Sequence, residues 1–467
     1  MKLTHGICAA AMSAALLPAT PAAAQVAGSQ TPSTLQDELA AMRARMDAMA
    51  QRIETLESEL QAAENAATPP PPAFAPPASA PVAVAPAAAT QDPIAEATDV
   101  KFGGAPEISQ GGWSFKPRGR LQYDAGFVDA PSSTGADDGF GSEARRIRLG
   151  ASGDMPGGFG YKFEADFAGN DIAVTDALIA YDAGAATITV GQFNTFQSLE
   201  ELTSSLHTSF IERAAFTDAF GFERRVGVAA EFGSDTVLVQ TGMFTDNMED
   251  LPSGNWGADG RVVFNPRLAG SVLHLGASVH YNDLEAGSSV RYRQRPLVHF
   301  TSERFVNTGN LGASSEFGFG AEGAVISGPF HAVAEGYWQN VNLPGAANDP
   351  GFFGGYAEIG YFLTAGDTRG YKGGKFDRTK PARPVGDGGI GSIQANLRYD
   401  HLDLNDAGVF GGKQDGYFVS LVWKPTNYTM LLANYGKLSY TDAVLAAAGG
   451  DTDYDVDVFG VRAQIDF

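Results

Sequence analysis

The chain has 467 residues, of which 44% are hydrophobic, and its 32 basic and 54 acidic residues give a formal net charge of −22. A nucleic-acid-binding protein would need the opposite sign, because its main contacts are with phosphate groups, and that class is therefore excluded. The single cysteine, Cys8, falls within the leader segment described next, so the rest of the chain offers no disulfide and no cysteine metal site.

The N-terminal part of the chain divides into three segments of different composition. Residues 1–24 are predicted to be a secretory signal peptide, with a basic start, an apolar core and a small-residue cleavage site at 22–24. Residues 25–66 carry apolar side chains at alternating spacings of four and three, which predicts a parallel coiled coil; a single amphipathic helix is the alternative. The seam consists of Leu35, Leu39, Met42, Met46, Met49, Ile53, Leu56 and Leu60.

Residues 67–100 form an Ala/Pro-rich linker that includes four consecutive prolines at 69–72. Such a run cannot continue a helix and favours an extended polyproline conformation. We predict that it is a spacer between the coiled coil and the folded part of the chain. A tether without a further role is the alternative.

Residues 101–467 alternate apolar and polar side chains in the manner of β-strands separated by turns. One face of the last strand is wholly apolar: Phe459, Val461, Ala463, Ile465 and Phe467. The other face is glycine, arginine, glutamine and aspartate, which is the pattern of a strand between lipid and a watery lumen. The predicted fold class is therefore all-β, a transmembrane antiparallel β-barrel, although composition alone also fits a soluble β-sandwich.

Sixteen strands are expected, provided that residues 283–313 form one long loop rather than a further strand. The number must be even if both ends of the barrel lie on the same side of the membrane, which we expect to be the periplasmic side. Short turns such as 154–158 and 424–427 alternate with longer polar loops, as expected for two rims of different character.

Positive charge is concentrated at positions that should face the lumen. The first strand alternates three basic residues with apolar ones: Lys116, Arg118 and Arg120. The second strand carries another basic row, in which the first member lies at the strand's edge: Arg145, Arg146 and Arg148. Guanidinium groups offer planar pairs of donors to oxyanions, and a low-dielectric wall strengthens their field. These rows predict an anion path. A mixed-charge channel is the alternative, because Lys162, Glu164 and Asp166 share one lumenal face.

Two further basic clusters lie in long connections. One is in loop 283–313 and adds a third row if that loop folds into the bore: Arg291, Arg293 and Arg295. The other is in a long insert on the periplasmic side: Arg369, Lys372, Lys375, Arg378, Lys380 and Arg383.

The loop at about 194–222 is too long for a simple rim connection, so we expect it to fold inward and narrow the channel; a flap on the rim is the alternative. It contains three polar residues that we predict at the constriction: Ser204, Ser205 and His207. No serine, histidine and acid occur together in a nucleophile context, and the aspartates at 451–457 fit a solvated rim better than a calcium site. We therefore predict no enzymatic activity, no cofactor and no metal.

Several motifs together resemble the phosphate-selective porins, the O/P family, over about residues 100–467. They are Trp113–Asp124, Arg145–Gly150, Gly158–Phe167, Gly191–Phe193, Ser198–Ser205 and Tyr371–Arg383. The resemblance implies a sixteen-stranded trimeric outer-membrane channel with an arginine ladder above a constriction of serines and lysines. By position, the ladder would include Arg145, Arg146, Arg291, Arg293 and Arg295, the constriction Ser204 and Ser205, and an inward periplasmic turn Lys372, Lys375 and Lys380. The chain departs from the family pattern at Leu206 and His207, where relatives carry a basic residue.

The sequence thus predicts an outer-membrane porin for passive diffusion of small anions, with phosphate or related oxyanions as solutes. The alternative is a general diffusion porin for small hydrophilic solutes, with the coiled coil acting as a periplasmic tether. The expected partners are small anions, outer-membrane lipid, two further copies in a homotrimer, and the outer-membrane assembly machinery, which would bind the terminal Phe467. No nucleic acid is expected to bind.

Overall fold

The computed structural model describes residues 98–467. The predicted signal peptide, the coiled-coil segment and nearly all of the Ala/Pro-rich linker lie outside the described residues. Among the helices of residues 98–467, none is long and apolar enough to cross a bilayer.

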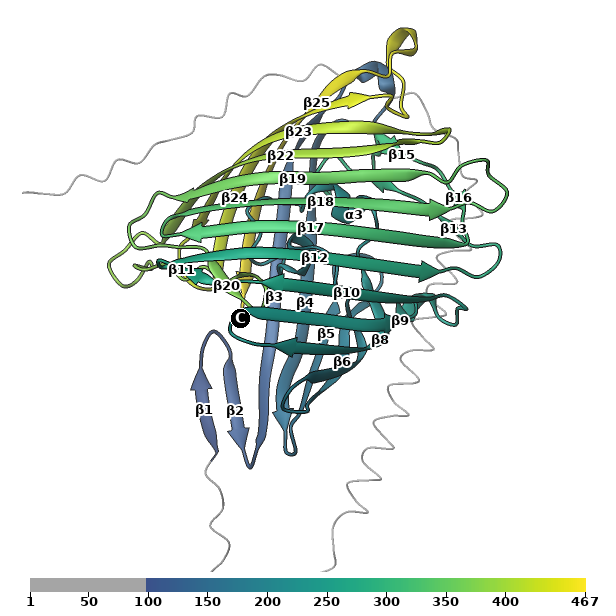
Figure 1. Cartoon of the computed structure of the whole chain (residues 1–467). Helices are drawn as coiled ribbons and strands as arrows, with labels where there is room; N and C mark the ends of the chain where they lie inside the picture. Colours follow the sequence, from purple (N-terminus) through teal and green to yellow (C-terminus); the bar gives the residue numbers. More distant parts are fainter. Residues whose placement is uncertain (1–97) are drawn as a thin grey trace, which may run out of the picture. The chain divides into compact units, whose positions relative to one another are not determined.

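Sixteen strands of the described chain form one closed antiparallel barrel, as the sequence predicted (Figure 1). Each strand pairs with the next along the chain, and the last pairs with the first, for example Val461 with Ala125. Closure leaves no sheet edge, which is required of a β-structure in lipid. The barrel strands are β3 (Trp113–Asp129), β4 (Gly139–Met155), β5 (Phe159–Asp166), β6 (Ala173–Asp182), β7 (Thr187–Asn194), β8 (Arg224–Gly233), β9 (Val237–Phe244), β10 (Trp256–Phe264), β12 (Ser271–Asp283), β17 (Ser315–Ser327), β18 (Phe330–Asn342), β19 (Gly351–Phe362), β22 (Ser392–Asp406), β23 (Val409–Lys424), β24 (Thr429–Thr441) and β25 (Tyr454–Asp466).

The two faces of the wall follow the alternation in the sequence. In β25, Val461 and Ile465 are 39% and 49% exposed on the outer face, whereas Arg462 and Gln464 are buried on the inner face. The same rule makes the odd-numbered residues of β3 point outward and the even-numbered residues inward. An outer surface of this kind, apolar and continuous around the barrel, suits contact with hydrocarbon.

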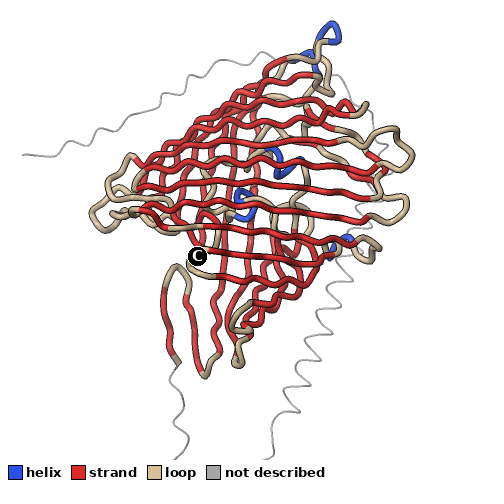
Figure 2. Tube along the Cα trace, in the orientation of Figure 1, coloured by secondary structure: helices blue, strands red, loops and turns tan. Residues whose placement is uncertain are grey.

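The remaining described elements are short; β1 and β2 precede the first barrel strand, and the others lie in the connections between barrel strands (Figure 2). The segment between β12 and β17 adds no barrel strand, since these two pair directly along their length, so the prediction that 283–313 is one loop is confirmed. The short elements are β1 (Asp99–Phe102), β2 (Pro106–Gln110), β11 (Arg267–Leu268), β13 (Ser289–Val290), β14 (Arg293–Gln294), β15 (Val306–Asn307), β16 (Leu311–Gly312), β20 (Gly370–Lys372), β21 (Lys375–Asp377), η1 (Ser132–Thr134), α2 (Leu199–Leu202), α3 (Ala215–Ala219), η2 (Met248–Asp250) and η3 (Ala448–Gly450).

Three long connections enter the lumen. We name them the inward loop (195–223, between β7 and β8), the long loop (284–314, between β12 and β17) and the insert (363–391, between β19 and β22). Because strands alternate in direction, the insert enters from the rim that holds the C-terminus, and the other two enter from the opposite rim. The expectation that the loop at 194–222 folds inward is met, since most of its side chains are buried against the inner wall.

The largest apolar cluster lies inside the barrel rather than between layers. Phe216 of α3 is fully buried and stacks on Tyr337 and Tyr356 of the inner wall, with ring centroids 6.1 and 6.3 Å apart. The long loop adds Val298 and Phe305 to the same cluster. This packing fills the lumen beside β18 to β25. The space beside β3 to β9 is left for the cavities described next.

Candidate functional site: the basic lumen

Three cavities follow one another inside the lumen of the described barrel. The loop cavity (about 140 Å³) lies between the inward loop, the long loop and β4. The central cavity (about 530 Å³) lies against β3 to β9, and the C-terminal cavity (about 630 Å³) reaches Phe467 and Tyr428 at the C-terminal rim. The loop cavity and the central cavity share Arg145, Arg146, Glu201 and Arg213.

The central and C-terminal cavities share five lining residues, which therefore mark the boundary between them. They are Arg120, Lys162, Leu202, Ser204 and Lys375. Three of the five are cationic, and they come from β3, β5 and the insert. An ion moving between the two cavities must pass this ring of positive charge.

The first basic row lies as its alternation predicted. Lys116, Arg118 and Arg120 project inward from β3 and line the C-terminal cavity. Arg120 is the cross-strand partner of Arg148 in β4, so the two basic rows lie side by side on the wall.

A β-bulge in β4 changes which arginines face the lumen. Arg146 pairs with Gln122 and Ala144 pairs with Tyr123, so Arg145 is the extra residue between them. A bulge leaves its extra residue unpaired and bends the strand. As a result Arg145 and Arg146 both line the central cavity. The prediction that Arg145 lies at the strand's edge is wrong, because β4 begins at Gly139, and alternation counted from the sequence also cannot register the inserted residue.

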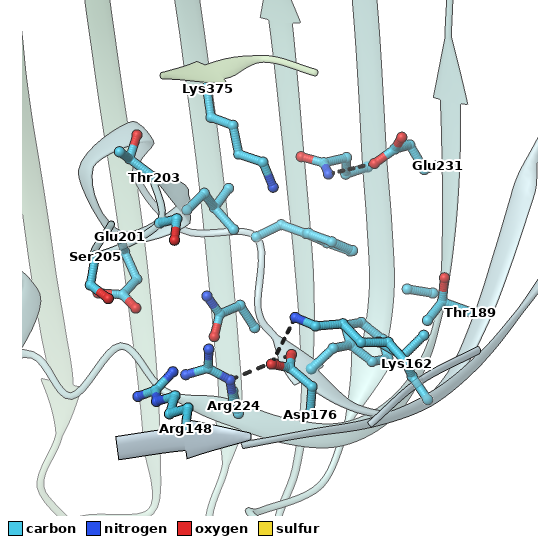
Figure 3. A pocket seen from close by; sticks show the side chains of 18 of the residues that line it. Arg148, Lys162, Asp176, Thr189, Glu201, Thr203, Ser205, Arg224, Glu231 and Lys375 are labelled. Carbon is cyan, nitrogen blue, oxygen red and sulfur yellow. Dashed lines mark hydrogen bonds and ion pairs between the residues drawn. The ribbon is translucent and has the colours of Figure 1, made fainter. Parts of the chain in front are cut away.

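Eight cationic and three carboxylate side chains line the central cavity. Most of the cations are paired: Lys162 Nζ lies 2.9 Å and Arg224 Nε 3.5 Å from the carboxylate of Asp176 (Figure 3). Arg148 and Arg120 share Glu164, at 3.3 and 3.2 Å. The ion pairs Arg145–Glu212 (2.8 Å) and Arg213–Glu201 (3.3 Å) complete the set.

Two of these cations have no carboxylate within 4 Å among the described residues. Arg146 donates only to the side-chain oxygen of Gln122, at 3.0 Å, and Lys375 extends from the insert into the cavity (Figure 3). Uncompensated cations in a confined, partly desolvated space are the strongest attractors for an anion.

Glu335 in β18 holds the start of the inward loop's helix α2. Its carboxylate accepts hydrogen bonds from the backbone N–H groups of Leu199 and Glu200 and from the hydroxyl of Ser198, each at 2.8 Å. These are among the N–H groups that a helix start leaves without an internal partner. This contact positions Leu202, the last residue of α2, and Ser204 just after it, both of which lie at the boundary between the cavities.

Other wall residues hold the remainder of the inward loop. The carboxylate of Asp400 accepts from the backbone N–H of Ala215 at 3.1 Å, and the side-chain oxygen of Asn434 accepts from Ile211 at 3.0 Å. Glu212 of the loop contacts Arg462 of β25 at 3.2 Å. The loop is thus held by polar contacts from several strands.

Two titratable groups of the inward loop have altered pKa values. Burial raises the pKa of Glu200 to about 7, and Glu358 acts in the same direction while Arg398 opposes it. Burial lowers the pKa of His207 to about 2, with Lys424 and Arg378 adding to the effect. His207 is therefore neutral at pH 7 and adds no charge to the lumen.

The comparisons with known proteins agree with this architecture. Residues 115–467 match the family described as phosphate-selective porin O and P. The chain belongs to this family. An uncharacterised protein of Caulobacter vibrioides is 43% identical over 453 residues, covering 93% of this chain and 90% of its own. Two structures of OmpT, an outer-membrane protein of Vibrio cholerae, have TM-scores of 0.50 at 12% and 11% identity; each covers 77% of this chain, and 99% and 100% of OmpT respectively.

The porin's other predicted site residues lie in different places. Ser204 is at the cavity boundary, Ser205 lines the central cavity and accepts a hydrogen bond from Arg120 at 3.0 Å, and His207 lines the C-terminal cavity. Lys380 lines the C-terminal cavity, whereas Lys372 lines none of the three.

In the long loop of the porin, only one of the three predicted arginines lines a cavity. Arg295 lines the loop cavity, while Arg291 and Arg293 are exposed and line none of the three. The loop folds with Tyr292 and Gln294 buried, which turns their arginine neighbours away. Side chains do alternate between two faces in this segment, as the sequence predicted. The buried face, however, carries Tyr292 and Gln294 and not Arg291 and Arg293.

Two lining cations were not among the predicted site residues. Arg213 lies in the inward loop and donates to the backbone oxygens of Glu200 and Thr203, at 3.0 and 2.7 Å. Arg224 lies where that loop rejoins β8. Their directions depend on the path of the loop, and the sequence carries no periodic signal for it.

Proposed function

We propose that this outer-membrane porin allows passive diffusion of small anions, with phosphate or a related oxyanion as solute. The observation that carries the proposal is the lining of the central cavity, where cations outnumber carboxylates eight to three and where Arg146 and Lys375 have no carboxylate within 4 Å in the described part of the chain. Guanidinium and ammonium groups replace the water around an oxyanion with directed donors.

An anion enters past Arg295, reaches the arginines at 145 and 146, and crosses the ring that contains Lys162 and Lys375. It leaves past Lys116 and Arg118 toward the C-terminal rim. Transport requires each site to hold the ion weakly enough to release it to the next. The carboxylates beside most of the cations weaken them in this way.

A general diffusion porin for small hydrophilic solutes is the second candidate. It is favoured by the same ion pairs, because six of the eight lining cations have a carboxylate neighbour. Mixed charge on a pore wall orders water and selects by size more than by sign.

The assembly that we propose is a homotrimer in the outer membrane, with the coiled coil in the periplasm as a tether. We also propose that the terminal Phe467 is bound by the assembly machinery of that membrane. Both termini of the barrel lie at one rim, which supports a periplasmic position for the N-terminal segment.

The purified porin in a planar bilayer tests the solute proposal. With a tenfold KCl gradient, the reversal potential should have the sign of chloride selectivity, and millimolar phosphate should reduce the chloride current. Equal permeation of potassium and chloride, together with a current that phosphate leaves unchanged, would favour the general porin.

A further inference from the structure

The side of the central cavity formed by β6 to β9 is apolar. Inward residues of these four strands form a small cluster with the first aromatic residue of the inward loop, separate from the main apolar cluster. We call it the apolar panel; it consists of Leu178, Phe193, Phe196, Ala229 and Phe244. All of these except Phe244 line the cavity. The porin thus has one basic and one apolar side in the same cavity.

The panel is built into the wall. Phe244 lies against two glycines, Gly227 of the neighbouring β8 and Gly242 of its own strand β9: a Cβ at Gly227 would be 2.5 Å from its ring, and one at Gly242 would be 2.7 Å away. Its ring meets Phe193 and Phe196 edge to face, with centroids 5.4 and 6.0 Å apart. Aromatic rings packed in this way form a firm surface. A pore that selects only an inorganic ion does not need such an apolar surface.

The panel lies next to the cations. Leu178 in β6 is the cross-strand partner of Lys162 in β5, and both face the lumen. Lys162 and Arg224 of β8 meet at Asp176, two residues from Leu178 along β6 (Figure 3). An oxyanion held by the basic side would therefore have its remaining atoms directed toward apolar side chains.

The size of the cavity also exceeds what a phosphate ion needs. At about 530 Å³ it falls in the range of about 300–1,000 Å³ that is usual for organic ligands, whose sites combine apolar walls with a few directed polar groups. A phosphate ion, with five heavy atoms, takes up only a few times the roughly 30 Å³ of a water molecule.

We propose that the central cavity selects organic anions in which a phosphate or carboxylate is joined to a compact apolar body about the size of one aromatic ring. Among the described residues, neither Arg146 nor Lys375 has a carboxylate within 4 Å, so either cation can hold the oxyanion while the body rests against Leu178 and Phe196. This inference depends on the proposed anion-porin function and narrows its solute class.

Block of the chloride current of the whole porin by two matched probes tests the proposal. Phenyl phosphate and inorganic phosphate are compared at about pH 8, where both are mainly dianions. Phenyl phosphate should reach half-block at about one-tenth the concentration, a ratio that corresponds to about 55 Å² of ring surface removed from water. Phenol, which has the ring without the oxyanion, should not block.

Substitutions on the panel separate its effect from that of charge. Leu178→Asn keeps the size and the net charge, and should raise the half-block concentration of phenyl phosphate several-fold without altering that of inorganic phosphate. Ala229→Ser is a milder second variant at the same panel, with a smaller shift in the same direction. Val385→Asn, at an exposed site in the insert that lines none of the three cavities, is the matched control and should change neither value.

Three results would overturn the proposal. Equal half-block concentrations of the two phosphates, with anion preference retained, reject the organic solute class and leave the proposed function standing. Equal weakening of both phosphates by Leu178→Asn would mean that the panel only supports the wall. A channel without anion preference, on which neither phosphate acts, rejects the proposed function and this inference together.

Discussion

The basic residues of the lumen differ mainly in whether a carboxylate lies beside them. Arg148 and Arg120 both contact Glu164, and each is thereby largely compensated. Arg146, two residues from Arg148 along β4, donates to the uncharged amide of Gln122 and has no carboxylate within 4 Å among residues 98–467. We therefore expect Arg146 to contribute more to anion preference than the paired arginines beside it.

Arg146→Gln should lower the ratio of chloride to potassium permeability about threefold. The figure follows from removing one charge about 6 Å from the ion in a medium close to water, an interaction of about 0.7 kcal/mol. The measurement is the reversal potential in a salt gradient. Arg267→Gln, at an exposed position of the short strand β11 that lines none of the three cavities, is the control. An unchanged ratio in Arg146→Gln would remove this residue from the anion path.

Strand alternation in the sequence was enough to predict that Lys116, Arg118 and Arg146 face the lumen. It could not predict which of them are compensated, because Glu164 becomes a neighbour of Arg120 only when three strands assemble. The inserted residue at Arg145 was missed for a related reason. A bulge depends on the register of two strands and not on either sequence alone.

At the scale of elements, the inward loop decides where the lumen is filled. Its length predicted the inward fold, but its anchors were not predictable, because Glu335 lies 135 residues after the N–H of Glu200 that it holds. The contact joins a buried carboxylate to a helix start across the barrel. Loss of an acceptor from such a buried group costs about 1–3 kcal/mol.

Glu335→Gln should loosen the inward loop without opening the barrel. An amide keeps one acceptor oxygen and turns an N–H₂ group toward donors that need an acceptor, so the start of α2 loses part of its support. Single-channel records should show a higher conductance with brief fluctuations, and the resistance of the barrel to heating in detergent should change little. Glu249→Gln, in the exposed helix η2, is the control. A steady wild-type conductance in Glu335→Gln would mean that the other anchors suffice.

At the scale of the whole molecule, the barrel is complete within residues 113–467. β25 pairs with β3 over Asp457 to Asp466, and the cavity lining begins at Gly103. The sequence predicted this closure well, because strand alternation and turns are local signals and every hairpin of the barrel carries them. The contents of the lumen were harder to predict, since Lys375 reaches it through an insert whose Gly374 oxygen accepts a hydrogen bond from Arg261, at 2.8 Å.

Deletion of residues 31–90 should therefore leave the conductance and reversal potential unchanged, because no part of the described barrel or of its cavity lining is removed. If the heptad seam joins three copies, the same deletion should lower the temperature at which the trimer dissociates in detergent, as followed by gel electrophoresis.

Deletion of 67–90 alone keeps the seam and removes most of the linker, so it should preserve that temperature but reduce the distance between the outer membrane and the cell wall. Unaltered trimer stability after deletion of 31–90 would mean that the heptad seam does not hold the trimer together. An altered conductance would show that the N-terminal segment reaches the pore.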